Sequence, residues 1–254
     1  MNDKVSTPWK NEEEFYDMHA HKFFSTGKFY HAWVLGKSDQ EFAKYIINKL
    51  QLKSTDKIID LGCGSGFLVS EISKVCKAIG ISTSKECVKH SKLNFPNCKF
   101  EIGDMQTFES DKVTHFLSLE SIGYADIDKT FSNVYSQLTD GGIFYIKDIS
   151  IVSNPNTKEA ENIRYWENYW HYIGRSIPFM INKAYEHGFK LVSVNDLNED
   201  ESRDLAPFQI TLQENNLEQK YPHPEVWVHV GSEFIFKKEK RKNFNPKMLK
   251  GSLI

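Results

Sequence analysis

The stretch that decides the fold is Lys57-Ile-Ile-Asp60-Leu-Gly62-Cys-Gly64-Ser-Gly66, which runs into a helix-like segment at residues 67–74. A short β-branched run that ends in an acid predicts a buried parallel strand, and the glycines after it predict a tight loop before a helix. Glycine at alternate positions lets this loop adopt positive φ angles and lets a ligand contact bare backbone. The spacing is not the G-x-G-x-x-G of dinucleotide sites, and no Lys-Ser/Thr pair follows to indicate a P-loop. An acid at the end of this strand suits a ligand that carries a cationic amine.

Two more strands with polar ends follow in order. Residues 77–81 predict a second strand, and Ser84 is expected to cap the helix that begins there. Residues 98–102 predict a third strand, with Asp104 just past its end. Because ligands of open α/β sheets bind at the carboxyl ends of the strands, these acids and the glycine loop are expected to form one site. Taken alone, the glycines are equally compatible with an ordinary strand-to-helix turn.

This order of motifs resembles class I S-adenosylmethionine (SAM)-dependent methyltransferases over about residues 40–240. The resemblance implies an α/β fold, a Rossmann-like seven-stranded sheet that is mostly parallel with the last strand antiparallel. It also implies an enzyme whose cofactor is S-adenosyl-L-methionine. In that family the acid and the glycine loop hold the methionine moiety, and an acid after the third strand accepts a hydrogen bond from the adenine amino group while the next backbone N–H meets the ring. Carried onto this sequence, the donor-binding residues are Asp60, Gly62, Gly64, Gly66, Asp104 and Met105.

Two departures narrow the subgroup. Gly80-Ile-Ser82-Thr83-Ser84 has a hydroxyl residue where most class I enzymes have an acid for the ribose, so Ser82 and Thr83 are the expected ribose contacts. Ser118-Leu-Glu120-Ser-Ile-Gly-Tyr124-Ala-Asp126 resembles the E-S-x-x-H-x-x-D segment of the sterol, tocopherol, cyclopropane-fatty-acid and geranyl diphosphate C-methyltransferases, with Tyr124 in place of histidine. This resemblance implies that Glu120 faces the pocket, where a carboxylate can stabilise a carbocation or accept a proton. The alternative is that Glu120 only orders a loop or binds the amine of the donor.

The remaining expected site residues are aromatic or cationic. Residues 28–33 resemble the Y-H-x-G-Y-W lid stretch of that group, which makes Tyr30 and His31 candidate catalytic residues and Trp33 a candidate substrate contact. One further substrate candidate is Tyr124, from the segment after the fourth strand. The others come from the aromatic stretch at 165–172 and the residue before it, and are Arg164, Tyr165, Trp166 and Tyr169. Packing of these rings in the core is an equally good interpretation. If the acceptor is a prenyl diphosphate, Lys28, Arg164 and Arg175 are the candidate phosphate partners.

The expected function is methyl transfer to a small molecule, with an alkene or isoprenoid carbon, such as that of a prenyl diphosphate, as the favoured acceptor. The alternative is a small-molecule N- or O-methyltransferase. A nucleic-acid substrate is not expected, because the formal net charge is −2 and no N-P-P-Y or D-P-P-Y sequence follows the fourth strand. No metal site is expected, since none of the four cysteines forms a C-x-x-C pair. The oligomeric state cannot be read from the sequence.

Three regions are predicted along the chain. Residues 1–38 are expected to form N-terminal lid helices, residues 39–240 the methyltransferase domain with a substrate-lid insertion at 150–177, and residues 241–254 a basic tail. Strands are predicted near 57–61, 77–81, 98–102, 113–118, 143–149, 189–194 and 226–236, with helices between them. The start of the chain lacks the apolar stretch of a signal peptide and no run approaches 18 apolar residues, so a cytoplasmic protein without a membrane span is expected. The basic run at 237–242 is expected to be a solvated face.

Overall fold

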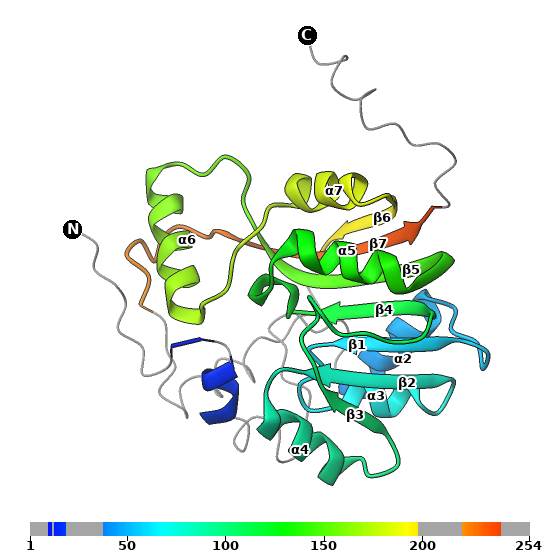
Figure 1. Cartoon of the computed structure of the whole chain (residues 1–254). Coiled ribbons are helices and arrows are strands. Elements are labelled where there is room, and N and C mark those ends of the chain that lie inside the picture. Colours follow the sequence, from blue (N-terminus) through cyan, green and yellow to red (C-terminus); the bar gives the residue numbers. More distant parts are fainter. Residues whose placement is uncertain (1–9, 12, 19–37, 198–219, 240–254) are drawn as a thin grey trace.

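The computed structural model of the chain describes residues 10–11, 13–18, 38–197 and 220–239. Its centre is one seven-stranded sheet with the order β3-β2-β1-β4-β5-β7-β6 (Figure 1). The strands are β1 (Lys57–Leu61), β2 (Lys77–Ser82), β3 (Lys99–Ile102), β4 (Val113–Leu119), β5 (Leu138–Ile151), β6 (Phe189–Asp196) and β7 (His229–Lys238). Strands β1 to β5 pair in parallel, whereas β7 runs antiparallel between β5 and β6. The predicted mostly parallel sheet with an antiparallel last strand is therefore confirmed.

Helices cover both faces of the sheet, and each face has its own apolar core. The helices are α2 (Asp39–Lys49), α3 (Phe67–Ile72), α4 (Lys85–Asn94), α5 (Ile127–Gln137), α6 (Thr157–Trp170) and α7 (Ile177–Glu186), with a short 3₁₀ helix η1 (Ile122–Tyr124) and a helix at residues 13–18. Buried side chains of α2, α3 and α4 form one core cluster, and those of α5 and α7 form the other. Strands buried on both faces account for the nearly continuous apolar runs of the sequence.

Polar side chains fix where the helices begin. Ser38 caps α2, Asp126 caps α5, and Ser84 caps α4 as predicted. At α6, Asn156 and Glu159 form a reciprocal capping box. Each cap satisfies backbone N–H groups that have no partner within the helix. The caps of α4 and α5 matter most for the site, because both helices begin at the carboxyl edge of the sheet.

Several strand boundaries differ from the prediction by one to three residues, and the start of β5 differs by five. Strand β5 begins at Leu138, five residues earlier than expected, because Leu138 is fully buried and pairs with Val113 across a register shift. Strand β7 extends to Lys238, whose side chain is buried and whose Nζ donates to the carbonyl oxygens of Tyr135 and Leu138 at the end of α5. The expectation that the whole basic run from 237 onward is solvated is therefore wrong for Lys238.

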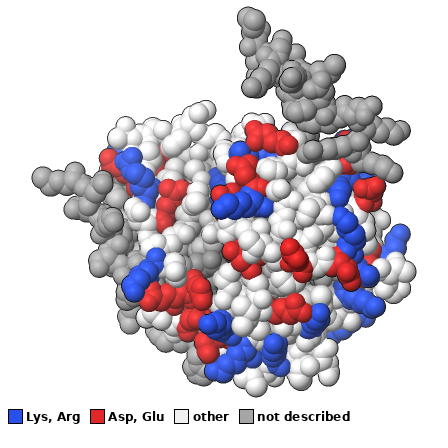
Figure 2. All heavy atoms as spheres, viewed as in Figure 1, with Lys and Arg blue, Asp and Glu red and all other residues white. Residues whose placement is uncertain are grey.

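The remaining charges are mixed on the surface that Figure 2 shows, where Lys and Arg lie among Asp and Glu without forming a patch of one sign. In the ranges that the structure describes, no helix is both long and apolar enough to cross a bilayer. The expected lid residues at 19–37 and the tail at 241–254 lie outside the described residues, so the three-region division stays a prediction.

Candidate functional site

The glycine loop after β1 adopts the backbone expected of it. Gly62, Gly64 and Gly66 have φ angles of 78°, 49° and 80°, in the region that side chains disfavour. At Gly62 a Cβ atom would lie 2.5 Å from the Cβ of Ser121, and at Gly66 it would lie 2.7 Å from the ring of Phe100. Two of the three glycines therefore allow close packing as well as the turn.

Asp60 is a buried acid at the end of β1, and no hydrogen bond or ion pair within the described residues uses its carboxylate. Burial raises the pKa of Asp60 to about 7. A carboxylate without a cation in a dry position is costly, and a cationic ligand group would relieve that cost. Asp60 beside the glycine loop is thus suited to bind an ammonium group.

Ser121 ties the end of β1 to the segment that follows β4. Its hydroxyl donates to the carbonyl oxygen of Leu61 at 2.6 Å and lies 2.8 Å from the hydroxyl of Ser118. Because the backbone of Gly62 packs on Ser121, the two loops that flank the expected donor site are held together. The residues after Ser121 are consequently placed beside the glycine loop.

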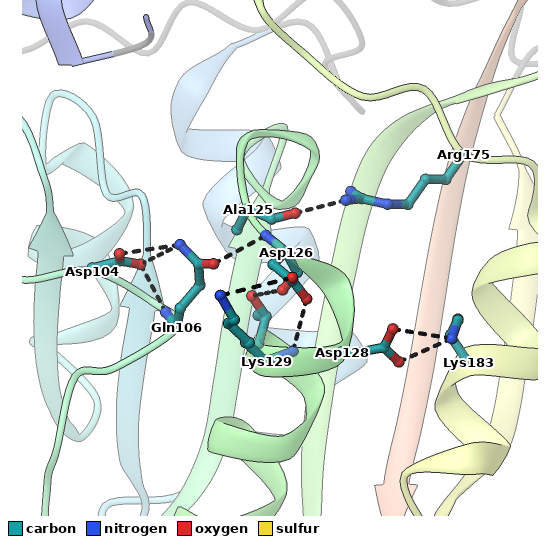
Figure 3. Close-up of polar contacts among 9 residues, drawn as sticks. Asp104, Gln106, Ala125, Asp126, Asp128, Lys129, Arg175 and Lys183 are labelled. Carbon is teal, nitrogen blue, oxygen red and sulfur yellow. Dashed lines mark hydrogen bonds and ion pairs between the residues drawn. The ribbon is translucent and has the colours of Figure 1, made fainter.

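Asp104 lies past the end of β3, as predicted, but a neighbouring side chain contacts its carboxylate. Gln106 donates to Asp104 Oδ1 from its backbone N–H at 2.8 Å and from Nε2 at 3.1 Å (Figure 3). The Oε1 atom of Gln106 accepts from the backbone N–H of Asp126, the cap of α5. The side chain of Met105 is buried among the core residues, and its carbonyl oxygen accepts from Asn133. Asp104 is therefore oriented from α5 at the edge where adenine is expected.

The expected ribose residues lie at the end of β2, under the short helix 13–18. The hydroxyl of Ser82 accepts from the backbone N–H of Ser84 at 3.2 Å, and Thr83 is half-buried. Asp17 accepts from the hydroxyl of Ser84 at 2.5 Å and from the backbone N–H of Glu86 at 3.3 Å. Helix 13–18, dark blue in Figure 1, is thereby fixed over the start of α4, with its carboxylate at the positive end of that helix.

Glu120 has a buried cationic partner that the sequence did not indicate. Its Oε1 atom lies 2.5 Å from Nζ of Lys147 on β5. The Lys147 side chain is fully buried, whereas the Glu120 side chain is 14% exposed. Glu120 also has a left-handed backbone, with φ 49°, and its N–H donates to the Lys147 carbonyl oxygen. A buried ammonium needs a counter-charge, so Glu120 is held as a carboxylate at the surface of the site.

Arg175 does not face a ligand, which corrects the expectation that it binds phosphates. Its guanidinium is buried and donates to the carbonyl oxygen of Ile122 at 3.0 Å. It also donates to the carbonyl oxygen of Ala125 at 2.6 Å (Figure 3). The backbone N–H of Ile173 donates to the carbonyl oxygen of Gly123. The segment after α6 therefore clamps η1, the element that follows Glu120 and Ser121.

Tyr124 belongs to a chain of ring contacts. Its ring packs edge-on against Tyr172 at 4.6 Å and against Tyr16 at 6.0 Å. The hydroxyls of Tyr16 and Tyr124 lie 3.5 Å apart. Helix 13–18 thus contacts both η1 and, through Phe15 and Trp170 at 5.4 Å, helix α6.

The other expected substrate residues of α6 point in different directions. Trp166 is buried and packs on Tyr172 and His229, and Arg164 is exposed. Tyr165 stacks on Tyr169, and its hydroxyl accepts from the backbone N–H of Lys220. The structure therefore brings Tyr165 and Tyr169 together, whereas Trp166 packs on Tyr172 and His229 and Arg164 is exposed. The other candidates, Lys28, Tyr30, His31 and Trp33, lie outside the described residues.

Asp148 and Tyr172 form a buried pair that the sequence interpretation missed. The hydroxyl of Tyr172 donates to Asp148 on β5, and burial raises the pKa of Asp148 to about 7. The ring of Tyr172 lies against Gly123, where an added Cβ would be 1.9 Å from the ring. Asp148 carries the same signal as Asp60, an acid near the carboxyl end of an apolar parallel strand. Tyr172 carried no local signal, because its partners are far away in sequence.

Comparison with known proteins decides the family. The profile of a family described as methyltransferase domain matches residues 52–220, from the residues just before β1 to those just before β7. The chain belongs to this methyltransferase family. Its glycine loop, Asp60 and Asp104 all fall within the matched range.

Curated relatives in this family include fungal sterol methyltransferases. The sterol 24-C-methyltransferase of Kluyveromyces lactis is 25% identical over 226 residues, which cover 81% of this chain and 60% of that protein. The sterol 24-C-methyltransferase erg6 of Schizosaccharomyces pombe is 23% identical over 215 residues, covering 76% and 55%. The methyltransferase chain thus spans about half the length of the curated relatives it matches.

Solved structures share the fold. The geranyl diphosphate C-methyltransferase of Streptomyces coelicolor A3(2) has a TM-score of 0.64 at 14% identity and covers 92% of this chain and 98% of that one. A protein described as the [4+2]-cyclase SpnF has a TM-score of 0.67 at 11% identity, covering 90% and 96%. Because one of these neighbours is named for a cyclisation, the methyltransferase fold alone does not define the reaction.

Proposed function

We propose that this protein is a SAM-dependent methyltransferase that acts on a small molecule. The observation that carries the proposal is the buried carboxylate of Asp60, which has no cationic partner among the described residues and adjoins a glycine loop with three left-handed backbones. A ligand with an ammonium group and a need for close backbone contact fits this arrangement. The α-amino group of S-adenosylmethionine provides that ammonium.

The other donor contacts follow from the order of the strands. Asp60 and the loop from Gly62 to Gly66 are assigned to the methionine end, Ser82 and Thr83 to the ribose, and Asp104 with the backbone N–H of Met105 to adenine. Strands β1, β2 and β3 are adjacent in the sheet, so these three positions lie side by side along its carboxyl edge. Gln106 contacts Asp104 at the adenine position, and Asp17 contacts Ser84 beside the ribose position.

S-adenosylmethionine supplies a methyl group already activated by its sulfonium, so the protein's part is mainly to align the acceptor and exclude water. Helix 13–18 and α6 both pack on the edge of the site through aromatic rings, which suits the exclusion of water. Glu120 and the face of Tyr124 supply negative electrostatic potential next to the glycine loop.

The favoured acceptor is an alkene or isoprenoid carbon. Attack of an alkene on a methyl group leaves a carbocation, which a carboxylate and aromatic faces stabilise. Glu120, kept anionic by Lys147, and the ring of Tyr124 provide this environment. The names of the sterol and geranyl diphosphate C-methyltransferases that this chain resembles add support. With Arg175 bound to backbone carbonyls, only Lys28 and Arg164 remain as candidate phosphate partners from the sequence.

The test is incubation with methyl-labelled S-adenosylmethionine and a panel of prenyl diphosphates, sterols, fatty acids, amines and phenols, read by mass spectrometry. New carbon–methyl bonds in an isoprenoid are expected. If the label appeared only on nitrogen or oxygen atoms, the acceptor atom would not be carbon and the protein would be an N- or O-methyltransferase. A matched control is Asp60→Asn, which should lose turnover at low donor concentration for every acceptor. If the wild-type protein did not bind S-adenosylmethionine, the proposal itself would be contradicted.

A further inference from the structure

Helix α4 contacts the glycine loop through one buried hydroxyl group. Ser91 is fully buried, and its Oγ atom lies 2.9 Å from the carbonyl oxygen of Gly64 in the loop. The same Oγ atom lies 2.9 Å from the carbonyl oxygen of Cys87, one turn earlier in α4. A serine inside a helix often bonds only to the carbonyl four residues before it, as to Cys87 here. The second contact is different, because it joins α4 to the loop that follows β1.

The loop carbonyl needs this hydroxyl more than the helix carbonyl does. A hydroxyl has one hydrogen to donate, so Ser91 shares it between two acceptors. Cys87 lies inside α4, where backbone N–H groups serve the carbonyl oxygens one turn before them. Among the residues that the structure describes, no donor other than Ser91 reaches the carbonyl oxygen of Gly64. Ser91 is therefore the group that satisfies Gly64.

This hydrogen bond orients the peptide unit that joins Gly64 to Ser65. A trans peptide is planar, so its C=O and N–H groups point in opposite directions, and holding the carbonyl of Gly64 also aims the N–H of Ser65. Gly64 has a φ of 49°, but glycine adopts either sign of φ at little cost, so the residue itself does not fix the turn. Ser91 also packs on the loop at a second point, since a Cβ atom added at Gly66 would lie 2.9 Å from the Cβ of Ser91. The backbone of the loop therefore depends on α4 for its orientation.

We propose that Ser91 is a positioning residue for the methyl donor. It holds the peptide between Gly64 and Ser65 in the orientation that the methionine end of S-adenosylmethionine requires. This inference rests on the proposed function, in which the glycine loop contacts that end of the donor. Because Ser91 is fully buried, it acts through the loop and not by contact with the ligand. Its loss should weaken binding of the methionine end and leave binding of the adenosine part, at the ends of β2 and β3, nearly unchanged.

The test titrates two ligands calorimetrically into the full-length protein, S-adenosylhomocysteine and methylthioadenosine, which lacks the amino-acid end. In Ser91→Ala the Kd of S-adenosylhomocysteine should rise about fivefold to tenfold, the size of one hydrogen bond, and that of methylthioadenosine far less. Alanine favours helices, so α4 should still form. Ser91→Cys keeps the shape with a weaker donor and should lie between the wild type and Ser91→Ala. The control is Thr114→Val, which removes a hydroxyl that donates to the carbonyl oxygen of Lys57 at the opposite edge of the sheet and should change neither Kd.

Two results would overturn the role of Ser91 alone while the proposed function stands. One is a wild-type Kd for S-adenosylhomocysteine in Ser91→Ala, and the other is an equal loss of affinity for both ligands, which would indicate a general loss of structure. A wild type that binds no S-adenosylhomocysteine would contradict the proposed function and this inference together. If Ser91→Ala does not fold, Ser91→Cys decides, and a ratio of the two Kd values equal to that of the wild type would overturn the inference.

Discussion

Several ionisable side chains of this site are buried, where their charged forms lower the stability of the fold. Asp60 and Asp148 are buried acids near the carboxyl ends of β1 and β5, and burial raises the pKa of each to about 7. Glu120 and Lys147 are a buried pair of opposite charge beside them. Backbone strain adds to the cost of these buried charges, because Glu120 is one of the few described residues other than glycine with a left-handed backbone. Such costs are typical of positions kept for a ligand.

Asp60→Asn is expected to weaken binding of S-adenosylhomocysteine roughly 10- to 100-fold, through loss of a charge-assisted hydrogen bond. The same change should stabilise the ligand-free protein at pH 8. The folded pKa of Asp60 is raised from 3.8 to about 7, so its ionisation cost grows as the pH rises from 4 to 7 and is fully present above 7. The gain should be on the order of 1–3 kcal/mol at pH 8 and vanish at pH 4.

Calorimetry and thermal unfolding at the two pH values check both parts of this prediction. Lower stability of Asp60→Asn at pH 8, with intact ligand binding, would show that Asp60 is a structural acid. Asp104→Asn is the matched control, since Asp104 is only half-buried and contacts Gln106. It should weaken binding without the gain in stability at pH 8.

The role of Glu120 requires two variants, because Glu120→Gln alone leaves the ammonium of Lys147 buried and unpaired. That single change should destabilise the fold by about 3 kcal/mol. Adding Lys147→Met removes the unpaired charge and should restore most of the stability. In the double variant, kcat is expected to fall about 10²- to 10⁴-fold if the carboxylate acts in the transition state. Affinity for S-adenosylhomocysteine should change by less than about tenfold.

Steady-state kinetics at saturating donor, with urea unfolding of the single and double variants, separates these effects. Lys147→Met alone serves as the control for the loss of the ammonium. A double variant with wild-type kcat would show that Glu120 has only an electrostatic pairing role.

At the scale of elements, the sequence predicted the order and type of almost every strand and helix. Periodicity and caps such as Ser84 are local signals, and the structure follows them. The start of β5 was missed because Asp140-Gly141-Gly142 has the composition of a turn, yet Gly141 with φ 77° forms an irregularity inside a strand whose first residue pairs with Val113. Which strand pairs with Leu138 is decided by the tertiary structure, so the local sequence gives no signal of it.

The same reason explains what could and could not be predicted of the site. Asp60 lies at the end of a strand, and the glycines and Asp104 come just after strands, so their places could be predicted from the sequence. Arg175 was misassigned because an arginine in an aromatic stretch has the same local appearance whether it contacts phosphates or carbonyl oxygens. Its partners, Ile122 and Ala125, are some fifty residues away.

Arg175→Met is expected to loosen the clamp on η1. It leaves the carbonyl oxygen of Ala125 without a donor and that of Ile122 with only the backbone N–H of Ala125, which should destabilise the protein by about 1–3 kcal/mol. Because η1 follows Ser121, which packs on Gly62, the KM for the donor should also rise. Arg164→Met is the control, since Arg164 is exposed on α6 and should change stability by less than about 0.5 kcal/mol. Urea unfolding and donor kinetics measure both, and equal stability of the two variants would contradict the clamp.

On the scale of the whole molecule, one buried carboxylate joins helix α2 to three neighbouring strands of the sheet, β5, β7 and β6. Glu233 of β7 accepts from Tyr145 of β5 at 2.7 Å and from Asn195 of β6 at 2.6 Å. It also accepts from Tyr45 at 3.0 Å and pairs with Lys49, both on α2. Burial holds the pKa of Tyr145 far above its usual range, so its hydroxyl remains a donor. Four elements therefore depend on one side chain that is 1% exposed.

Glu233→Gln should lower the free energy of unfolding by about 2 kcal/mol, because an amide replaces charged hydrogen bonds with neutral ones and one oxygen acceptor is lost. Lys49 is partly exposed and can reach water, which keeps the loss from being larger. The control is Glu225→Gln, whose carboxylate forms an exposed pair with Lys158 and should give no measurable change. Because glutamine can keep most of the hydrogen bonds that Glu233 makes to α2, β5 and β6, the variant should still unfold in one step. Urea transitions followed by far-ultraviolet circular dichroism and by the fluorescence of the five tryptophans should therefore coincide at a lower midpoint and unchanged slope. Separated transitions would mean that Glu233 is what makes helix α2 and the strands β5, β7 and β6 unfold together.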